Sequence, residues 1–213
     1  FYEKDLNERP EERFIEISER SFSNYDKTKL TTFFVGGDLN IGRGVDIKWL
    51  RLSNNNLRFL FDRVEPYINS ADMAMLMLEH SYQGDPVPCS TCTSFVGDEA
   101  TFPQIKDAGI DFLVMAGNHI GDGGLKAQER TMELVNQYNM LHAGAGANLE
   151  EASKPGIVEF AGVKYAIFSA DEVATFYWAG DSRRGSNRFS KFVGPNKVID
   201  TEKIQKDIAE AKK

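Results

Sequence analysis

Histidine and cysteine are scarce in this chain of 213 residues, which contains three histidines and two cysteines. Three imidazoles leave room for one metal ligand or one proton-transfer residue, but they cannot fill a histidine-rich site. A zinc site at Cys89 and Cys92 would need two more ligands, and His80 is the only obvious donor nearby. A local disulfide in an exported protein fits their spacing better than a redox motif, because they lie in a predicted loop and not at a helix N-terminus.

The chain also lacks an excess of positive charge and a long apolar run. It has 25 Lys and Arg against 32 Asp and Glu, a net charge of −7, which argues against a nucleic-acid-binding protein. The best apolar run, Met73–Leu78, has the length of a strand and not of a membrane span. Residues 1–20 carry eleven charges where a signal peptide would have its apolar core. With 41% hydrophobic and 27% charged residues, the composition is that of an ordinary globular protein.

Strands and helices are predicted to alternate from residue 31 onward, after a polar N-terminal arm over residues 1–30. Apolar runs predict three strands and a hairpin, and apolar faces predict helices. The expected strands are 31–36, 73–78 and 110–115, the hairpin is 157–169, and the expected helices are 57–68 with a break at Pro66, 102–108, 125–138 and one that begins after Asp200. This alternation predicts one α/β domain over residues 31–213 with a mainly parallel sheet.

Polar residues follow the predicted strands at nearly even spacing. Asp38 follows the first strand, Glu79 lies 41 residues later, and Asn118 with His119 lies another 39 residues on. The carboxyl ends of adjacent parallel strands meet at one edge, so these side chains are expected to converge. Carboxylate, amide and imidazole donors suit Mg, Mn, Fe or Zn. Each residue taken alone also has a structural explanation, as a turn, a solvated strand end or a hydrogen-bonded core histidine.

Four ordered motifs carry a resemblance to a known family. They are Gly37-Asp38-Leu39-Asn40-Ile41-Gly42-Arg43; Ala71-Asp72 leading into Leu78-Glu79; Lys106-Asp107-Ala108-Gly109-Ile110-Asp111 running into Asn118-His119 and Asp122-Gly123; and Gly144-Ala145-Gly146 with Asn148, Glu151-Ala152 and Pro155. Together they resemble the capsule-synthesis proteins of CapA type, which are linked to poly-γ-glutamate and are similar to calcineurin-type metallophosphoesterases.

The resemblance implies the α/β N-terminal part of a metallophosphoesterase-like four-layer α/β/β/α sandwich. It also implies divalent metal ions (Mn, Mg, Fe or Zn) and a role for each site residue. Asp38, Glu79 and Asn118 would be metal ligands, and His119 would be the catalytic acid. Apart from the resemblance, Arg43 could clamp a phosphate or carboxylate, and Asn40 and His80, which lie close to the proposed ligands in sequence, are further candidates for substrate binding. Arg43 is equally explained as a surface arginine paired with an acid, and His80 as a cap on its strand.

The chain departs from the family pattern at Met77, where the family has Asn, and at Gly117, where it has the first of two asparagines. Two further histidine motifs of the family would lie beyond Lys213, so we expect the domain to be incomplete at its C-terminus and the metal site half built. Two functions therefore stay open. One is a metal-dependent hydrolase or transferase acting on an anionic polymer or a phosphorylated small molecule. The other is a non-catalytic polymer-binding, anchoring or export component.

The resemblance further implies an extracytoplasmic or envelope-associated protein, with other capsule-synthesis membrane components as partners. Three segments outside the strand ends have both a functional and a structural explanation. The basic run Arg183, Arg184, Arg188 and Lys191 could hold an anionic polymer or form a solvated loop. His142 is expected to be structural, and residues 176–178 (Phe-Tyr-Trp) are expected to cover the core more than to bind a ligand.

Overall fold

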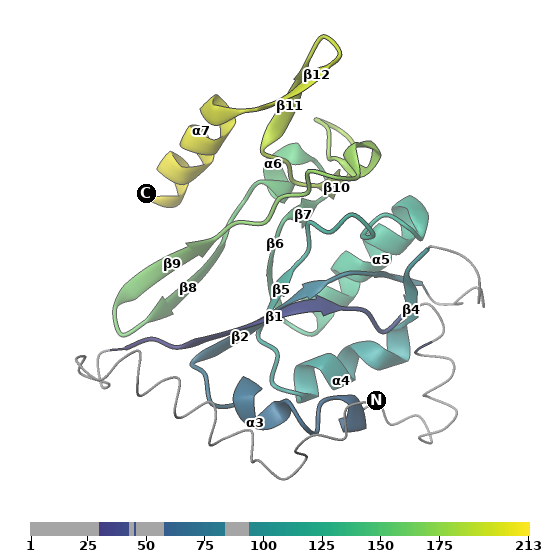
Figure 1. The fold of residues 1–213 in the computed structure, drawn as a ribbon, viewed down its shortest axis with the longest axis vertical. Coiled ribbons are helices and arrows are strands. Elements are labelled where there is room, and N and C mark those ends of the chain that lie inside the picture. The colour runs from purple at the N-terminus through teal and green to yellow at the C-terminus, as the bar shows by residue number, and fades with distance from the viewer. Residues whose placement is uncertain (1–29, 43–44, 46–57, 84–93) are drawn as a thin grey trace, which may run out of the picture.

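The computed structural model describes residues 30–42, 45, 58–83 and 94–213 of the chain. At its centre lies a parallel sheet with the strand order β1-β2-β5-β6. Its strands are β1 (Phe33–Leu39), β2 (Met73–Leu78), β5 (Phe112–Val114) and β6 (Leu141–Ala143). The structure confirms the predicted α/β class with a parallel sheet (Figure 1). The fourth strand, β6, was not predicted, because three residues with a central His142 give no strand pattern.

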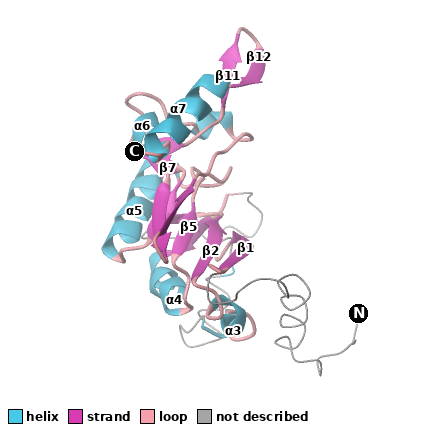
Figure 2. Ribbon diagram, turned by 90° about the vertical axis from the view of Figure 1, so that its left-hand side faces the viewer, coloured by secondary structure: helices cyan, strands magenta, loops and turns pink. Residues whose placement is uncertain are grey.

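Two helices cover one face of this sheet, α4 (Phe102–Asp107) and α5 (Gly124–Gln137) (Figures 1 and 2). Both were predicted from their apolar faces. Their side chains pack with the sheet into the larger core cluster, which includes Phe102, Ile105, Leu113, Leu134 and Val135. The buried positions of α5 recur every three or four residues, as one helix face requires.

The predicted hairpin forms from β8 (Gly156–Phe160) and β9 (Val163–Ile167), which pair antiparallel. Ala161 and Gly162 form its turn with φ of 49° and 79°, a left-handed two-residue turn in which glycine carries no steric cost. Val158 of β8 packs with Met73, Phe112 and Ala143 in a second core cluster, separate from the helix-covered one. The sheet therefore lies between a layer of helices and a hairpin.

The remaining elements are short. They are η2 (Arg58–Leu60), α3 (Glu65–Ile68), β3 (Ser81–Gln83), β4 (Val96–Asp98), η3 (Glu99–Thr101), β7 (Ala145–Gly146), α6 (Leu149–Ala152), η4 (Thr175–Tyr177), β10 (Gly185–Ser186), β11 (Ser190–Val193), β12 (Asn196–Ile199) and α7 (Thr201–Ala211). The predicted helix over 57–68 is divided into η2 and α3, and Pro66 lies in the first turn of α3, where its missing N–H is tolerated. The predicted loop over 81–97 contains β3 and β4, which pair in parallel.

The end of β1 differs from the prediction in a way that affects the site, whereas the start of α7 is as predicted. β1 runs on to Leu39, past the predicted end at residue 36, and its register with β2 shifts between Val35 and Asp38. Asp38 therefore lies within the strand. Asp200 caps α7 as predicted, with its side chain accepting from the backbone N–H of Lys203, but no residue of α7 is buried.

The four-layer sandwich remains a prediction, because every sheet of the described residues other than the central one has two strands. Most of the predicted N-terminal arm (residues 1–29), Arg43, Cys89 and Cys92 lie outside the described residues, and so do the predictions about them. Among the described residues, no helix is both long and apolar enough to span a bilayer.

Candidate functional site

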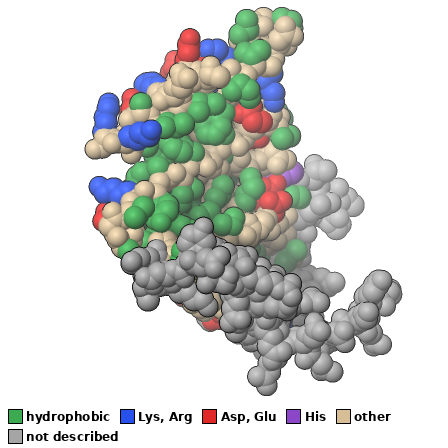
Figure 3. Space-filling model, turned by 60° about the vertical axis from the view of Figure 1, so that its left-hand side comes forward, with side chains coloured by type: hydrophobic (Ala, Val, Ile, Leu, Met, Phe, Trp, Pro, Cys, Tyr) green, Lys and Arg blue, Asp and Glu red, His purple; other side chains and the backbone are tan. Residues whose placement is uncertain are grey.

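The carboxyl ends of β1, β2 and β5 bring three of the predicted site residues to one edge of the sheet. Asp38 of β1 is in register with Met77 of β2, and the backbone N–H of Glu79 donates to the carbonyl oxygen of Leu39. Asp38 is exposed, whereas the side chain of Glu79 is buried, with 6% of the residue accessible. Asn118, four residues past the end of β5, is half-buried. Figure 3 shows acidic side chains beside a histidine at one margin of a largely apolar face.

Negative charge accumulates around the carboxyl group of Glu79. Burial raises the pKa of Glu79, and the neighbouring carboxylates of Asp38, Asp122 and Asp171 raise it further, while His119 lowers it. We call these five residues, Asp38, Glu79, His119, Asp122 and Asp171, the Glu79 cluster. Among the described residues, no lysine or arginine is named as a group that shifts this pKa. The cluster therefore has an excess of negative charge that a bound cation would offset.

Gly117 makes room for the Glu79 side chain. A Cβ atom at position 117 would lie 2.8 Å from Oε2 of Glu79 and 3.1 Å from Cε of Met77. Real Cβ atoms do not approach other heavy atoms below 3.0 Å, so any larger residue at this position would displace the carboxylate. The glycine that departs from the family pattern at position 117 therefore allows the side chains of Met77 and Glu79 to pack closely against the loop backbone.

The imidazole of His119 is fixed by its neighbours. Its Nδ1 lies 2.7 Å from Oδ2 of Asp122, and its ring stacks on Phe95 at a centroid distance of 3.9 Å and an interplanar angle of 22°. The backbone N–H of Phe95 donates to the same Asp122 oxygen at 2.7 Å. Nε2 of His119 lies 4.0 Å from Oε1 of Glu79. One ring nitrogen is therefore bound to Asp122 and the other faces Glu79.

Asp122, Phe95 and Asp171 were not predicted as site residues. Asp122 belongs to a motif quoted above, and its position three residues after His119 is a pattern from which the pairing could have been proposed. Phe95 and Asp171 gave no such pattern, because they reach the cluster from loops whose course depends on the tertiary structure.

The ring of His80 is packed in the core. The ring is fully buried, its Nδ1 lies 3.1 Å from the carbonyl oxygen of Leu39, and it packs edge-on against Tyr82. Burial lowers the pKa of His80 to about 4, so the ring is neutral at physiological pH. This geometry describes a core residue whose ring contacts the end of β1, and not a cap on its own strand. The role of His80 in substrate binding stays a prediction.

Asn40, the other predicted substrate-binding residue within the described part, turns its side chain onto its own loop. Its Oδ1 accepts a hydrogen bond from the backbone N–H of Gly42 at 3.0 Å, as in an Asx turn. The side chain thereby shapes the chain after β1. Its role in substrate binding stays a prediction.

The basic run is engaged within the protein. Arg183 donates to the carbonyl oxygen of Trp178, Arg184 to Glu129, and Arg188 to the carbonyl oxygen of Ser190, while Lys191 pairs with Asp200. Each of these four basic side chains therefore has a partner within the protein, and the run does not form an open patch of positive charge.

The three aromatic residues over 176–178 differ in exposure. Trp178 is buried, Tyr177 is half-buried and Phe176 is 69% exposed.

The oxygen donors Asp38, Glu79 and Asn118 have the chemistry that hard divalent cations prefer. The surplus of carboxylates around Glu79 fits the same class of ligand. As the side chains stand, no three His, Cys, Asp or Glu groups of the described residues are gathered closely enough to hold a metal ion. The donor set thus fits a divalent cation by type and charge, but the His, Cys, Asp and Glu side chains of the described residues do not stand at the spacing of a metal site.

Comparison with known proteins gives the family. Residues 32–213 match the family described as bacterial capsule synthesis protein PGA_cap, a span that contains the whole Glu79 cluster. The chain is also 26% identical over 164 residues to the capsule biosynthesis protein CapA of Bacillus anthracis. That alignment covers 70% of this chain and 38% of the relative, so the chain spans well under half of the relative's length. The predicted family is confirmed: the chain belongs to the PGA_cap family of bacterial capsule synthesis proteins.

Proposed function

We propose that the chain contributes a metal-dependent hydrolase or transferase site that acts on an anionic substrate during capsule biosynthesis. The substrate class is an anionic polymer or a phosphorylated small molecule. The observation that carries the proposal is the Glu79 cluster, in which Glu79 is buried beside three further carboxylates and an oriented histidine, and burial together with those carboxylates raises its pKa. Family membership supports the capsule context and, with it, a place at the cell envelope beside other capsule-synthesis components.

Asp38, Glu79 and Asn118 would hold the metal ion, of which Mn, Mg, Fe and Zn are the candidates. When bound, the ion would supply Lewis-acid polarisation of the substrate's reacting group. An anionic substrate would be repelled by the carboxylates of the cluster without a compensating cation, since like charges at short range in a partly buried site interact strongly. The charges of the described residues therefore support metal dependence.

His119 would act as the proton donor to the departing oxygen. Asp122 accepts a hydrogen bond from Nδ1, so that a proton carried on Nε2 would be the one available for transfer. Because Nε2 faces Glu79, the leaving oxygen would lie beside the same carboxylate edge at which the metal is held. The non-catalytic, polymer-binding alternative gains no support from the basic run, whose side chains are engaged within the protein.

The experiment is calorimetric titration of the chain with Mn²⁺, together with hydrolysis of p-nitrophenyl phosphate in the presence of that ion. Asp38→Asn is expected to weaken Mn²⁺ binding and hydrolysis by tenfold or more (about 1.4 kcal/mol of binding free energy). Asp181→Asn, a change of the same kind at an exposed position, is the matched control and should leave both unchanged. A chain that binds no Mn²⁺, or an Asp38→Asn variant indistinguishable from wild type, would contradict the proposal.

A further inference from the structure

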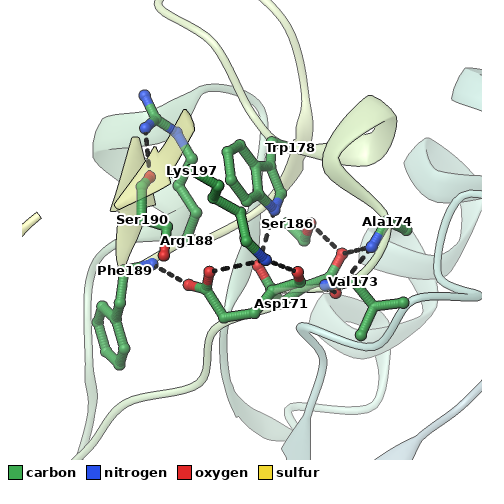
Figure 4. Close-up of polar contacts among 10 residues, drawn as sticks. Asp171, Val173, Ala174, Trp178, Ser186, Arg188, Phe189, Ser190 and Lys197 are labelled. Atoms are coloured by element: carbon green, nitrogen blue, oxygen red, sulfur yellow. Dashed lines mark hydrogen bonds and ion pairs between the residues drawn. The ribbon is translucent and has the colours of Figure 1, made fainter. Parts of the chain in front are cut away.

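The segment from Asp171 to Trp178 is held in shape by its own contacts (Figure 4). The carboxylate of Asp171 accepts from the backbone N–H groups of Val173 at 2.7 Å and Ala174 at 3.2 Å. The indole N–H of Trp178 donates to the carbonyl oxygen of Asp171 at 2.7 Å. Both ends of the segment are thus tied to one residue, which is itself buried.

Strand β10 secures the segment from outside. The hydroxyl of Ser186 contacts the Asp171 carboxylate at 3.5 Å and the carbonyl oxygen of Tyr177 at 3.3 Å. The backbone N–H of Asp171 donates to the carbonyl oxygen of Asn187 at 2.9 Å. The position of Tyr177 is therefore set by buried hydrogen bonds.

Tyr177 lies against the turn that carries His119. Its ring covers Gly121 so closely that a Cβ atom at position 121 would lie 2.2 Å from the ring. Its hydroxyl group is 3.4 Å from Oδ1 of Asp122. Burial raises the pKa of Tyr177 and the carboxylate of Asp122 raises it further, which keeps the hydroxyl protonated and able to donate.

The two oxygens of Asp122 have different partners. Oδ2 accepts from the backbone N–H of Phe95 and contacts Nδ1 of His119, while Oδ1 is the oxygen that the Tyr177 hydroxyl reaches. Tyr177 thus opposes rotation of the carboxylate that orients the imidazole. We infer that Tyr177 is a positioning residue, which acts through Asp122 and Gly121 to keep His119 with Nδ1 bound and Nε2 directed toward Glu79. The inference rests on the proposed function for its catalytic consequence, but its geometric part stands independently.

The test measures the tautomer of His119 directly. Long-range ¹H–¹⁵N NMR spectra of the chain are recorded over a pH series, with His119 assigned by comparison with His119→Gln. Wild type is expected to show a single form with the proton on Nδ1. Tyr177→Phe, which keeps the ring and removes the hydroxyl, is expected to add a form with the proton on Nε2. It should also lower kcat for p-nitrophenyl phosphate about three- to tenfold at unchanged KM, as the loss of one hydrogen bond would.

Tyr165→Phe is the matched control, because Tyr165 lies in the apolar cluster under the hairpin. It should leave the His119 spectrum and turnover unchanged. Gly121→Ala, which displaces the Tyr177 ring, is a second variant expected to shift the tautomer in the same direction. An unchanged His119 spectrum in both Tyr177→Phe and Gly121→Ala would overturn the inference. A tautomer shift in a chain without turnover would support the positioning role and contradict the proposed function.

Discussion

Glu79 is the residue on which the charges of the site converge. Its side chain is buried among carboxylates, and the resulting rise in its pKa means that its ionised form is disfavoured in the folded, metal-free protein. A cation would reverse that balance by favouring the ionised form. The same residue would therefore connect the stability of the fold to the binding of the proposed cation.

The pH dependence of stability tests this property of Glu79. Because its pKa is higher in the folded than in the unfolded state, the folded state binds more protons between the two values, and stability must fall as pH rises through that interval. In EDTA, we expect wild type to lose stability relative to Glu79→Gln as pH rises from about 4.5, the usual value, through the raised one. Urea unfolding over this pH range measures the difference.

The control for that experiment is Glu159→Gln, which changes an exposed glutamate on β8 in the same way. It should follow wild type at every pH. If Glu79→Gln also followed wild type throughout, the carboxylate would not carry the electrostatic cost assigned to it.

Two glycines near the site test how closely the loop after β5 packs. Gly117→Ala would place a methyl group against the Glu79 carboxylate, and we expect it to destabilise the fold by about 1–3 kcal/mol and to weaken Mn²⁺ binding. Gly37→Ala, on β1, meets nothing within 4 Å and is the matched control. Urea unfolding and calorimetry compare the two variants, and equal effects would contradict the packing argument.

At the scale of elements, α5 positions the site through the core and not through direct contact. Gly123, the residue that precedes α5, donates its backbone N–H to the hydroxyl of Ser81, and Asp122 comes directly before it. The helix is held on the sheet by its buried face. The placement of His119 and Asp122 therefore depends on that packing.

Two leucines on α5 separate the contribution of packing from that of helix propensity. Leu134 is 3% exposed and Leu125 is 59% exposed, so the same substitution to alanine removes core contacts only at Leu134. We expect Leu134→Ala to lower the free energy of unfolding by about 2–5 kcal/mol. Leu125→Ala should change it by less than about 1 kcal/mol. Chemical denaturation measures both changes in the free energy of unfolding. If Leu125→Ala cost as much as Leu134→Ala, core packing would not be the main contribution of these leucines to stability.

At the scale of the whole molecule, Asn187 joins parts of the chain that are far apart in sequence. Its backbone N–H donates to Gly144, its side-chain amide donates to the carbonyl oxygen of Ser169, and its Oδ1 accepts from Ser153 and Lys203. These contacts connect the turn after β6, the segment after β9, α6 and α7. One buried amide thus ties the C-terminal elements to the central sheet.

Replacing Asn187 should therefore destabilise the molecule globally. Asn187→Ala leaves buried partners without their hydrogen bonds, and we expect a loss of about 2–4 kcal/mol in the free energy of unfolding. Hydrogen exchange should show the lowered protection in both α6 and α7. Asn196→Ala, at an exposed position on β12, is the control and should leave exchange unchanged. A loss of protection confined to α7 would show that the connection is local.

The sequence alone determined the alternation of strands and helices, the hairpin, the cap of α7 and the family, because these follow from local periodicity, turn chemistry and ordered motifs. It also placed Asp38, Glu79 and Asn118 at one edge, since the ends of parallel strands must meet there. Only the tertiary structure decided that β6 joins the sheet, that His80 is enclosed in the core, and that Phe95, Tyr177 and Asp171 approach the Glu79 cluster. Those outcomes depend on contacts between residues distant in sequence, and no local pattern encodes which loop lies against which. The acidic strand ends could therefore be predicted, whereas the loops that orient His119 beside them could not.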